Sequence, residues 1–325
     1  MAVYVNTNYS ALQGQRYLGN VQNSLTTTYQ RLSSGMRINS AKDDAAGLQI
    51  ADRLTSQING LNQGNRNAAD GIALAQTIEA GMDEISGMLQ KMRTLAVQAN
   101  NGTNTMDDRK ALAKEVAALA TEVNRIATQT TFAGKTVLNG KGDTSLYGKA
   151  GGAGPGVGGN GGTAGKAGDT GSITLQVGSN KGDTISFDVE SVMFSKLAPV
   201  NALVGNGKVF STNQNTGEIK VFFSKAKTDA SADSFGAIIE MFDGAISKID
   251  GMRAGLGAIQ NRLESSIRNQ SNVAANEADA RSRIRDADFA EESANLSQQS
   301  IIQQAAASML MQANTRPQLG LSLLG

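Results

Sequence analysis

Proline is confined to three positions in this 325-residue chain, Pro155, Pro199 and Pro317. A proline ring inside a helix removes a backbone donor and clashes with the preceding turn, so proline-free stretches can hold long helices. Residues 1–154 and 200–316 contain no proline. The chain can therefore form long helices on both sides of its middle.

Apolar residues recur at steps of three or four along both proline-free stretches. These stripes are Leu18, Val21, Leu25, Tyr29 and Leu32; Leu48, Ala51, Leu54, Ile58 and Leu61; Ala68, Ile72, Ala75, Ile78, Met82, Ile85, Leu89, Met92 and Ala96; Leu112, Val116, Leu119, Val123 and Ile126; and Phe242, Ala245, Ile249, Met252, Leu256, Ile259 and Leu263. The spacing averages about 3.5 residues, the period of a seam between supercoiled helices. The segment Phe289–Leu310 is rich in Ala, Ser and Gln, and its apolar residues predict a further helix with a weaker apolar face.

The middle of the chain has a different pattern. Residues 141–171 contain 13 glycines in 31 positions, a density that costs too much backbone entropy to pack well without neighbours. Alternating apolar residues then predict two β-hairpins: Ile173, Leu175 and Val177 with Ile185, Phe187 and Val189 across Gly178–Gly182, and Val209 and Phe210 with Ile219, Val221 and Phe223. We expect a mainly α fold, a long antiparallel coiled coil or helical bundle formed by the N- and C-terminal arms, with a small β-hairpin-containing and Gly-rich central region.

The chain contains neither cysteine nor histidine. Disulfides, zinc ribbons, HExxH sites and histidine-based triads are therefore excluded, and we expect no catalytic residues, no metal and no cofactor. The 30 basic and 29 acidic residues give a net charge of +1, which provides no electrostatic footprint for nucleic acid. No stretch approaches the roughly 20 apolar residues of a membrane span, and Met1–Ser10 lacks the pattern of a secretory signal.

Three local motifs have simple structural interpretations. The GxGxxG spacing of Gly154, Gly156 and Gly159 is flanked by more glycine, whereas a dinucleotide site needs a strand before it and a helix after it. Asp43 follows Ser40 by three residues, as in a capping box, so the pair Asp43–Asp44 predicts a helix start and not acid–base chemistry. Methionines at positions 82, 92, 252 and 309 are expected to pack on apolar faces.

Several blocks of sequence resemble bacterial flagellins. They are Gln30–Leu54 (QRLSSGMRINSAKDDAAGLQIADRL), Leu61–Ile85, Leu89–Asn104, Ser282–Asn314 and the terminal LSLLG of Leu321–Gly325. The resemblance covers about residues 1–140 and 235–325 and has both ends in the right order. It implies a structural subunit that is exported by the flagellar type III apparatus and assembles into the extracellular helical filament used for motility.

The resemblance also implies a division of the chain into seven parts: an N-terminal inner-tube arm (1–43), rod helices (44–140), a Gly-rich variable insertion (141–171), the β-hairpin of the rod domain (172–195), a short variable outer segment (196–231), the C-terminal rod helix (232–283) and a C-terminal inner-tube arm (284–325). The stripes of the two arms are too thin to offset the entropy of ordering them alone. We therefore expect the arms to fold against identical neighbours during assembly.

Three groups of site residues follow from the resemblance. The subunit interface of the inner tube comprises Leu18, Val21, Leu25, Leu32, Phe289, Leu296, Ile301, Met309 and Leu310; the contact for the flagellar export chaperone comprises Phe289, Leu296, Ile302 and Leu310; and the patch similar to that recognised by host Toll-like receptor 5 comprises Lys91, Leu95 and Glu115. The filament cap and hook–filament junction proteins are further implied partners. Recognition by the receptor is an expected secondary role.

Three alternatives differ from this interpretation. A hook–filament junction protein shares the terminal helices, but the intact central blocks and the LSLLG ending favour a filament subunit. A flagellin with a metallopeptidase insert is excluded because the chain has no histidine for the metal. A surface adhesin built on the Gly-rich tract would lose adhesion and keep its filaments if residues 141–171 were deleted.

Overall fold

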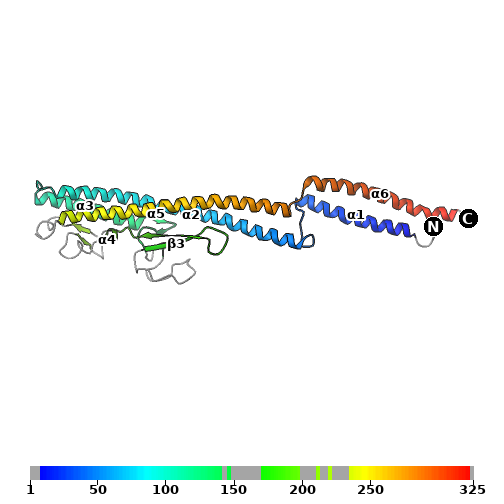
Figure 1. The fold of residues 1–325 in the computed structure, drawn as a ribbon, viewed down its shortest axis with the longest axis horizontal. Helices are drawn as coiled ribbons and strands as arrows, with labels where there is room; N and C mark the ends of the chain where they lie inside the picture. The colour runs from blue at the N-terminus through cyan, green and yellow to red at the C-terminus, as the bar shows by residue number, and fades with distance from the viewer. Residues whose placement is uncertain are drawn as a thin grey trace. The chain divides into compact units, whose positions relative to one another are not determined.

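The computed structural model describes residues 8–140, 145–147, 170–197, 210–212, 219–221 and 234–322. The helices are α1 (Tyr9–Ser34), α2 (Ala45–Ala99), α3 (Met106–Gln129), α4 (Phe194–Leu197), α5 (Ser234–Arg285) and α6 (Phe289–Ser322) (Figure 1). Three antiparallel strand pairs lie between them in sequence: β1 (Thr131–Phe132) with β2 (Lys135–Thr136), β3 (Thr170–Gln176) with β4 (Thr184–Glu190), and β5 (Phe210–Thr212) with β6 (Ile219–Val221). The mainly α fold with a small β-hairpin region is confirmed.

The chain forms two compact units. The first contains residues 1–59 and 272–325, and the second contains residues 60–271. Helices α2 and α5 each contribute one end to the first unit and the rest to the second. The helix breaks at residues 35–44 and 286–288 lie beside the predicted arm boundaries at 43 and 284, whereas the units divide at 59 and 272. The roles assigned to the seven parts remain predictions.

Polar side chains fix the starts of the helices. Asn8 accepts a hydrogen bond from the backbone N–H of Ala11 (3.1 Å) at the start of α1, which ends at Gly35 in the left-handed region with φ of 69°. At the start of α3, Thr105 and Asp108 form a reciprocal capping box. These caps satisfy backbone groups that have no partner inside the helix.

The prediction that Asp43 caps a helix is wrong, although a helix does begin directly after Asp43 and Asp44. Asp44 is the residue at the start of α2, where its Oδ1 accepts a hydrogen bond from Gly47 N–H (2.9 Å). Asp43 instead closes the turn before it, because its Oδ2 accepts from the backbone N–H groups of Asn39 (3.1 Å) and Ser40 (2.9 Å). Both carboxylates are structural, but the spacing that suggested a capping box belongs to a separate turn.

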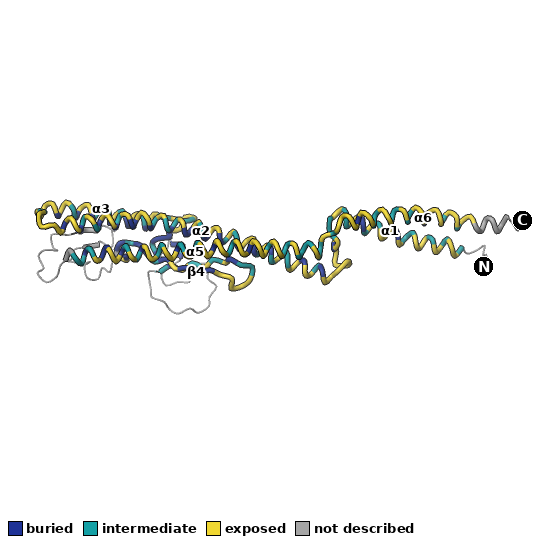
Figure 2. Tube along the Cα trace, turned by 45° about the horizontal axis from the view of Figure 1, so that its top comes forward, coloured by how far each residue is buried: buried dark blue, intermediate teal, exposed yellow. Residues whose placement is uncertain are grey.

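The second unit has a continuous core along α2, α3, α5 and the β3–β4 hairpin. Many of its fully buried side chains belong to the predicted stripes: Ile78, Met82, Ile85, Leu89 and Met92 of α2, Val116 and Val123 of α3, and Phe242 and Ile249 of α5 are 0% exposed. Leu138 and Ile238 are also 0% exposed, although no predicted stripe contains them. Figure 2 shows the buried positions following one side of these helices. Close packing of this kind makes the core sensitive to the loss of single methylene groups.

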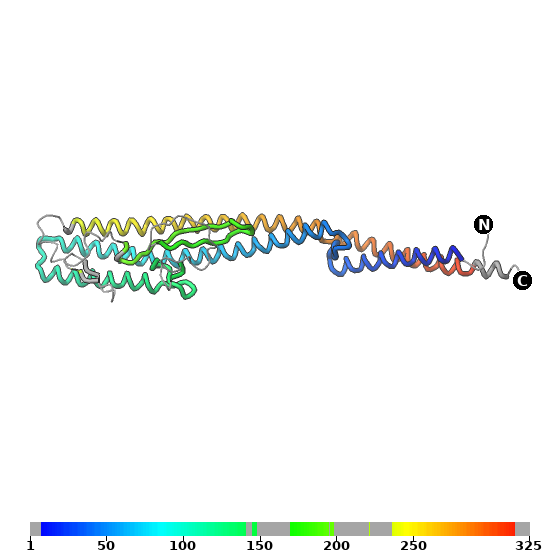
Figure 3. Tube along the Cα trace, turned by 90° about the horizontal axis from the view of Figure 1, so that it is seen from below, coloured from blue at the N-terminus to red at the C-terminus, as the bar shows by residue number. Residues whose placement is uncertain are grey.

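The β3–β4 hairpin lies along α2 and α5 (Figure 3). Ile173 pairs with Phe187 and Leu175 pairs with Ile185, so the predicted alternating residues share one face. A Cβ at Gly64 of α2 would lie 2.1 Å from the carbonyl oxygen of Val177. Glycine at this position therefore lets the backbone of the hairpin approach the helix closely.

The second predicted hairpin is confirmed as the strand pair β5–β6, in which Phe210 pairs with Val221. The predicted members Val209 and Phe223 and most of the turn between the strands lie outside the described residues. So do the GxGxxG glycines and most of the Gly-rich segment. The pairing shows that the alternation of apolar residues is informative even in this short segment.

The two described ends of the Gly-rich segment belong to the core of the second unit. Tyr147 is 5% exposed, and its hydroxyl donates a hydrogen bond to the carbonyl oxygen of Val137 (2.7 Å). Its ring covers Gly171, where a Cβ would lie 2.1 Å from the ring. A deletion of residues 141–171, as in the adhesin test above, would remove this buried contact together with the glycines between its two members.

Candidate self-assembly surface

Helices α1 and α6 lie side by side and antiparallel in the first unit (Figures 1 and 3). Near the tip of the pair, the side-chain amide of Asn8 donates to the carbonyl oxygen of Ala313 (2.7 Å). A Cβ built on Gly14 would lie 3.0 Å from Cδ1 of Leu310. These contacts fix the direction of the pair, since residues early in α1 meet residues late in α6.

The less exposed residues of both helices follow seven-residue repeats, as in a coiled coil. On α1 they are Gly14, Val21 and Thr28 beside Leu18, Leu25 and Leu32, and on α6 they are Glu292, Gln299, Ala306 and Ala313 beside Leu296, Gln303 and Leu310. The α1 rows contain every residue of the predicted stripe except Tyr29, and they add Gly14 and Thr28. The α6 rows contain polar and small residues that a search for apolar periodicity does not detect, so the pair buries little apolar surface.

The predicted interface residues divide into two groups. Val21 is buried, and Leu18, Leu25, Leu32, Leu296 and Leu310 are half-buried along the α1–α6 seam. Phe289, Ile301 and Met309 are 59%, 66% and 68% exposed. The expectation that Met309 packs on an apolar face is therefore wrong within the single chain, whereas Met82 and Met92 do pack in the core and Met252 is half-buried.

The predicted stripes do not include Tyr9, Leu12, Tyr17 or Met311, which are exposed apolar residues of the same two helices, and Tyr29 of the first stripe is exposed as well. Tyr9, Leu12, Tyr17 and Tyr29 of α1 are 75%, 50%, 55% and 54% exposed, and Met311 of α6 is 66% exposed. At about 100° per residue, Tyr17 and Tyr29 lie about 60° to either side of the α1 seam, and Tyr9 and Leu12 lie on the opposite face. Apolar residues on several faces of one helix are a signal for more than one packing partner.

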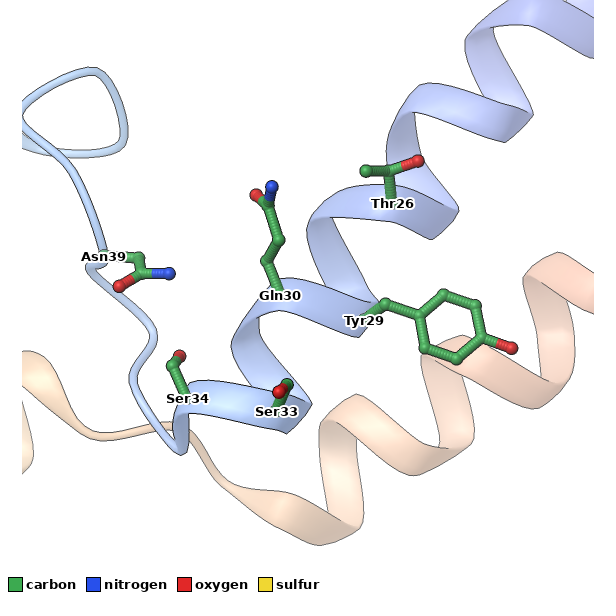
Figure 4. Close-up of a pocket in the computed structure, with 6 residues that line it drawn as sticks. All are labelled: Thr26, Tyr29, Gln30, Ser33, Ser34 and Asn39. Carbon is green, nitrogen blue, oxygen red and sulfur yellow. The ribbon is translucent and has the colours of Figure 1, made fainter.

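The described hollow beside α1 offers no reactive groups. It has a volume of about 480 Å³ and is lined by Thr26, Tyr29, Gln30, Ser33, Ser34 and Asn39. Figure 4 shows Gln30 and Asn39 extending toward the same open space, while the ring of Tyr29 points away from it. Hydroxyl and amide groups of this kind can donate and accept hydrogen bonds, but they supply no charged acid–base pair.

The shifted titratable groups are structural. Hydrogen bonds from Ser40 and Asn39 lower the pKa of Asp43, to which the charge of Arg31 adds a smaller effect. The hydroxyl of Thr105 lowers the pKa of Asp108, and Arg125 lowers the pKa of Glu122. Burial raises the pKa of the Tyr147 hydroxyl. Each shift is explained by hydrogen bonds in a turn or a helix cap, by an ion pair or by burial.

The described residues hold neither a cluster of metal ligands nor a membrane-spanning helix. Those residues contain no group of three or more aspartates, glutamates, histidines or cysteines that could hold a metal ion. Within the same part of the chain, no helix is both long enough and apolar enough to span a bilayer.

The predicted chaperone and receptor residues occupy different environments. Phe289 is exposed at the start of α6, whereas Leu296, Ile302 and Leu310 are half-buried. In the second unit, Lys91 of α2 and Glu115 of α3 are exposed, and Leu95 packs against the core. Lys91 lies in a hollow of about 430 Å³ together with Leu119 and Arg253. Both partner assignments remain predictions.

Two regions of the chain match a known family. Residues 5–143 match the bacterial flagellin N-terminal helical region, and residues 239–324 match the bacterial flagellin C-terminal helical region. Flagellin B of Vibrio cholerae is 38% identical over 377 aligned residues, and flagellin B of Vibrio anguillarum is 37% identical over 376. Both alignments cover all of this chain and all of the relative.

Solved structures add a likeness in fold. A putative flagellar hook-associated protein from Vibrio parahaemolyticus has a TM-score of 0.54 at 17% identity, covering 75% of this chain and 100% of that chain. A Bacillus cereus flagellin is 27% identical with a TM-score of 0.43, covering 65% of this chain and 94% of that chain. The first likeness shows a shared fold alone, and the second is too low in TM-score to carry an argument.

Proposed function

Because the chain belongs to the bacterial flagellin family, whose members are structural filament subunits and not enzymes, we propose that it self-assembles into the extracellular flagellar filament through α1 and α6. These two helices form the inner tube of the filament. The rod helices (44–140 and 232–283) and the β-hairpin (172–195) form the rod of the filament. The chain is exported by the flagellar type III apparatus before it assembles.

The observation that carries this proposal is the exposure of large apolar side chains at both chain ends. Tyr9, Tyr17, Ile301, Met309 and Met311 are each more than half exposed although α1 and α6 already pack on each other. Exposed apolar area of this extent marks an interaction surface. Copies of the same helices can cover it, and an interface that does not close into a ring propagates as a helical filament.

Truncation of the chain ends tests the proposal. Purified chains lacking residues 1–40 or 285–325 are added to sonicated filament seeds, and elongation is followed by electron microscopy. We expect both chains to stay soluble and helical, because the core of the second unit is intact, and to add no length to the seeds. A chain in which residues 149–168 are replaced by a short Gly-Ser linker is the control, and it should elongate seeds normally. Normal elongation by either truncated chain would contradict the proposal.

A flagellar export chaperone binds the C-terminal helix in this proposal. Phe289, Leu296, Ile302 and Leu310 form its contact, of which Leu296 and Leu310 lie on the α1–α6 seam. The chaperone and α1 would therefore compete for one face of α6. Pull-down by the co-expressed chaperone should fail for Leu296→Asp and Leu310→Asp and persist for the exposed control Ser308→Asp. The same helix later contacts the filament cap and the hook–filament junction proteins.

Recognition by Toll-like receptor 5 is a secondary role in this proposal. It rests on the resemblance at Lys91, Leu95 and Glu115, of which Lys91 and Glu115 are accessible. A lysine keeps the positive charge of an arginine but lacks its planar fork of donors. Substitution of Lys91 by Arg should therefore strengthen a receptor reporter response, and Lys91→Ala should weaken it.

The hook–filament junction protein is the alternative that the solved structures bring forward, since the shared fold includes a hook-associated protein. Electron microscopy separates the two functions. A filament subunit grows long fibres of uniform diameter from seeds, whereas a junction protein adds only a few copies to the end of a seed and elongation then stops.

A further inference from the structure

Two segments that lie about 250 residues apart in sequence meet at the base of the α1–α6 pair. Met36 and Asp286 form an antiparallel bridge. The backbone N–H of Arg37 donates to the carbonyl oxygen of Arg285 (2.7 Å), and that of Ala287 donates to Gly35 (3.0 Å). The loops after α1 and before α6 are therefore tied together by main-chain hydrogen bonds.

Side chains reinforce this bridge. Nη2 of Arg37 donates to the carbonyl oxygen of Ile284 (2.8 Å), and Ile38 is 3% exposed. Nη1 of Arg31 lies 3.2 Å from Oε1 of Glu292, whose side chain is 9% exposed against 33% for that of Arg31. We refer to Arg31, residues 35–38, residues 284–287 and Glu292 as the base clasp.

The rest of the α1–α6 seam specifies its register weakly. Leu296 and Leu310 are the large apolar residues on the α6 side of the seam, and the other members are polar or small: Gln299, Gln303, Ala306 and Ala313. A shift of α6 by one helical turn would therefore displace few large side chains. The same shift would move Glu292 away from Arg31 and leave a buried carboxylate without its cation. Leaving a buried carboxylate without its cation is unfavourable, and polar residues in a coiled-coil seam are known to fix register.

We propose that the base clasp selects both the partner and the register of the two chain ends, so that α1 pairs with α6 of its own chain and not with that of a neighbour. This inference rests on the proposed function, because it states how the helices of the inner tube are matched during assembly. The Arg31–Glu292 pair favours the correct partner and register at the base of the two helices. The rest of α1 and α6 then pairs in the same register.

Cross-linking in the full chain reports this register directly. The chain has no cysteine, so Gly14→Cys with Leu310→Cys introduces the only two thiols, at positions in contact in the clasped register. A short bismaleimide reagent joins them, and Gly14→Cys with Ala306→Cys is the pair shifted by one turn. Monomers and filaments grown from equal amounts of ¹⁵N-labelled and unlabelled chains are both treated, and mass spectrometry of the linked peptides separates links within and between chains.

The cross-link yield is then measured with the clasp altered. We expect Arg31→Glu or Glu292→Arg to lower the yield of the link between the thiols at positions 14 and 310 at least fivefold, and the double reversal to recover most of it. The neutral double variant Arg31→Gln with Glu292→Gln should lose the preference over the shifted pair. The exposed residues Arg16 and Glu291 provide charge-matched controls, and Arg16→Glu and Glu291→Arg should leave the yield unchanged.

Separate results decide the inference and the proposed function. Links between labelled and unlabelled chains, a double reversal no better than the single ones, or no preference for the unshifted pair in monomer or filament would overturn the base clasp. Failure of the unaltered chain to elongate seeds would overturn the proposed function, and the links in the monomer would still report on the clasp.

Discussion

The α2–α3–α5 core and the α1–α6 pair use similar spacings of apolar residues but bury them to very different extents. Met82, Ile85 and Leu89 of α2 are 0% exposed because α3, α5 and the hairpin surround that side of the helix. Ile301 and Met309 of α6 are 66% and 68% exposed because α1 covers only one side of that helix. The spacing of apolar residues therefore determines which side of a helix is apolar. The number of elements that pack against that side determines how far its residues are buried.

The largest effect is expected where the core is closed on all sides. Leu89→Ala should lower the free energy of unfolding of the second unit by about 2–5 kcal/mol, because it removes buried methylene groups and leaves a cavity. Ile301→Ala is the matched change on the open helix. It should alter the unfolding of the monomer by less than about 0.5 kcal/mol and still slow seed elongation.

Urea unfolding followed by circular dichroism, together with seeded elongation, measures both changes. Equal losses of monomer stability for the two variants would show that α6 is as well packed as α2, and the comparison would fail.

Gly171→Ala is expected to have the next largest effect. Its new Cβ would meet the buried ring of Tyr147 at 2.1 Å, and overpacking of this kind costs about 1–3 kcal/mol. Thermal unfolding of this variant should begin at a lower temperature than that of the parent chain. Gly102→Ala is the control, because a Cβ there meets nothing within 4 Å. A Gly171→Ala chain as stable as the control would show that the ring yields without cost.

Tyr147→Phe keeps the buried ring and removes its hydrogen bond to Val137. The expected loss is about 1 kcal/mol, the usual net contribution of such a bond.

The same hydroxyl gives a prediction for alkaline pH. Burial raises its pKa in the folded chain above the value of about 10 in the unfolded chain. Its contribution is therefore fully present below pH of about 10 and is lost as the pH rises toward the folded pKa. The difference in stability between the parent chain and Tyr147→Phe should shrink above this pH. A difference that grows with pH would contradict the buried, protonated hydroxyl.

The smallest expected effect is at the exposed start of α3. The hydroxyl of Thr105 lowers the pKa of Asp108, so the capping box is favoured above the unfolded pKa of about 3.9 and weakens as the pH falls through the folded pKa. Thr105→Val should raise the pKa of Asp108 toward its ordinary value in a carboxyl NMR titration. An unchanged pKa would show that the hydroxyl does not stabilise this carboxylate.

The sequence predicts the core of the second unit well and the seam of the first only in part. The stripe from Ile78 to Met92 lies on one side of α2 and all five of its residues are fully buried, so the apolar pattern and the packing agree. On α6 the seam passes through Glu292 and Gln299, which no apolar pattern selects. The predicted interface residues Ile301 and Met309 lie away from that seam. The spacing of apolar residues does not show which face of α6 meets α1.

Local chemistry shows a similar limit. The pair Asp43–Asp44 correctly predicts a helix start, but only the structure shows that Asp44 bonds to the helix and Asp43 to the preceding turn. The contact of Tyr147 with Gly171 is also invisible in the sequence, since a Gly-rich segment separates the two residues and neither belongs to a motif. Contacts of this kind depend on how the hairpin is seated against the core.

Amide hydrogen exchange of the monomer and of the assembled filament tests most directly whether the chain ends obtain their missing partners from neighbouring copies. Amides in the core of the second unit should be protected in both states. Those of α1 and α6 should exchange faster than the core amides in the monomer and become as protected as the core in the filament, because neighbouring copies then cover their exposed faces. If the amides of α1 and α6 were as protected in the isolated monomer as those of the core, the result would contradict this account.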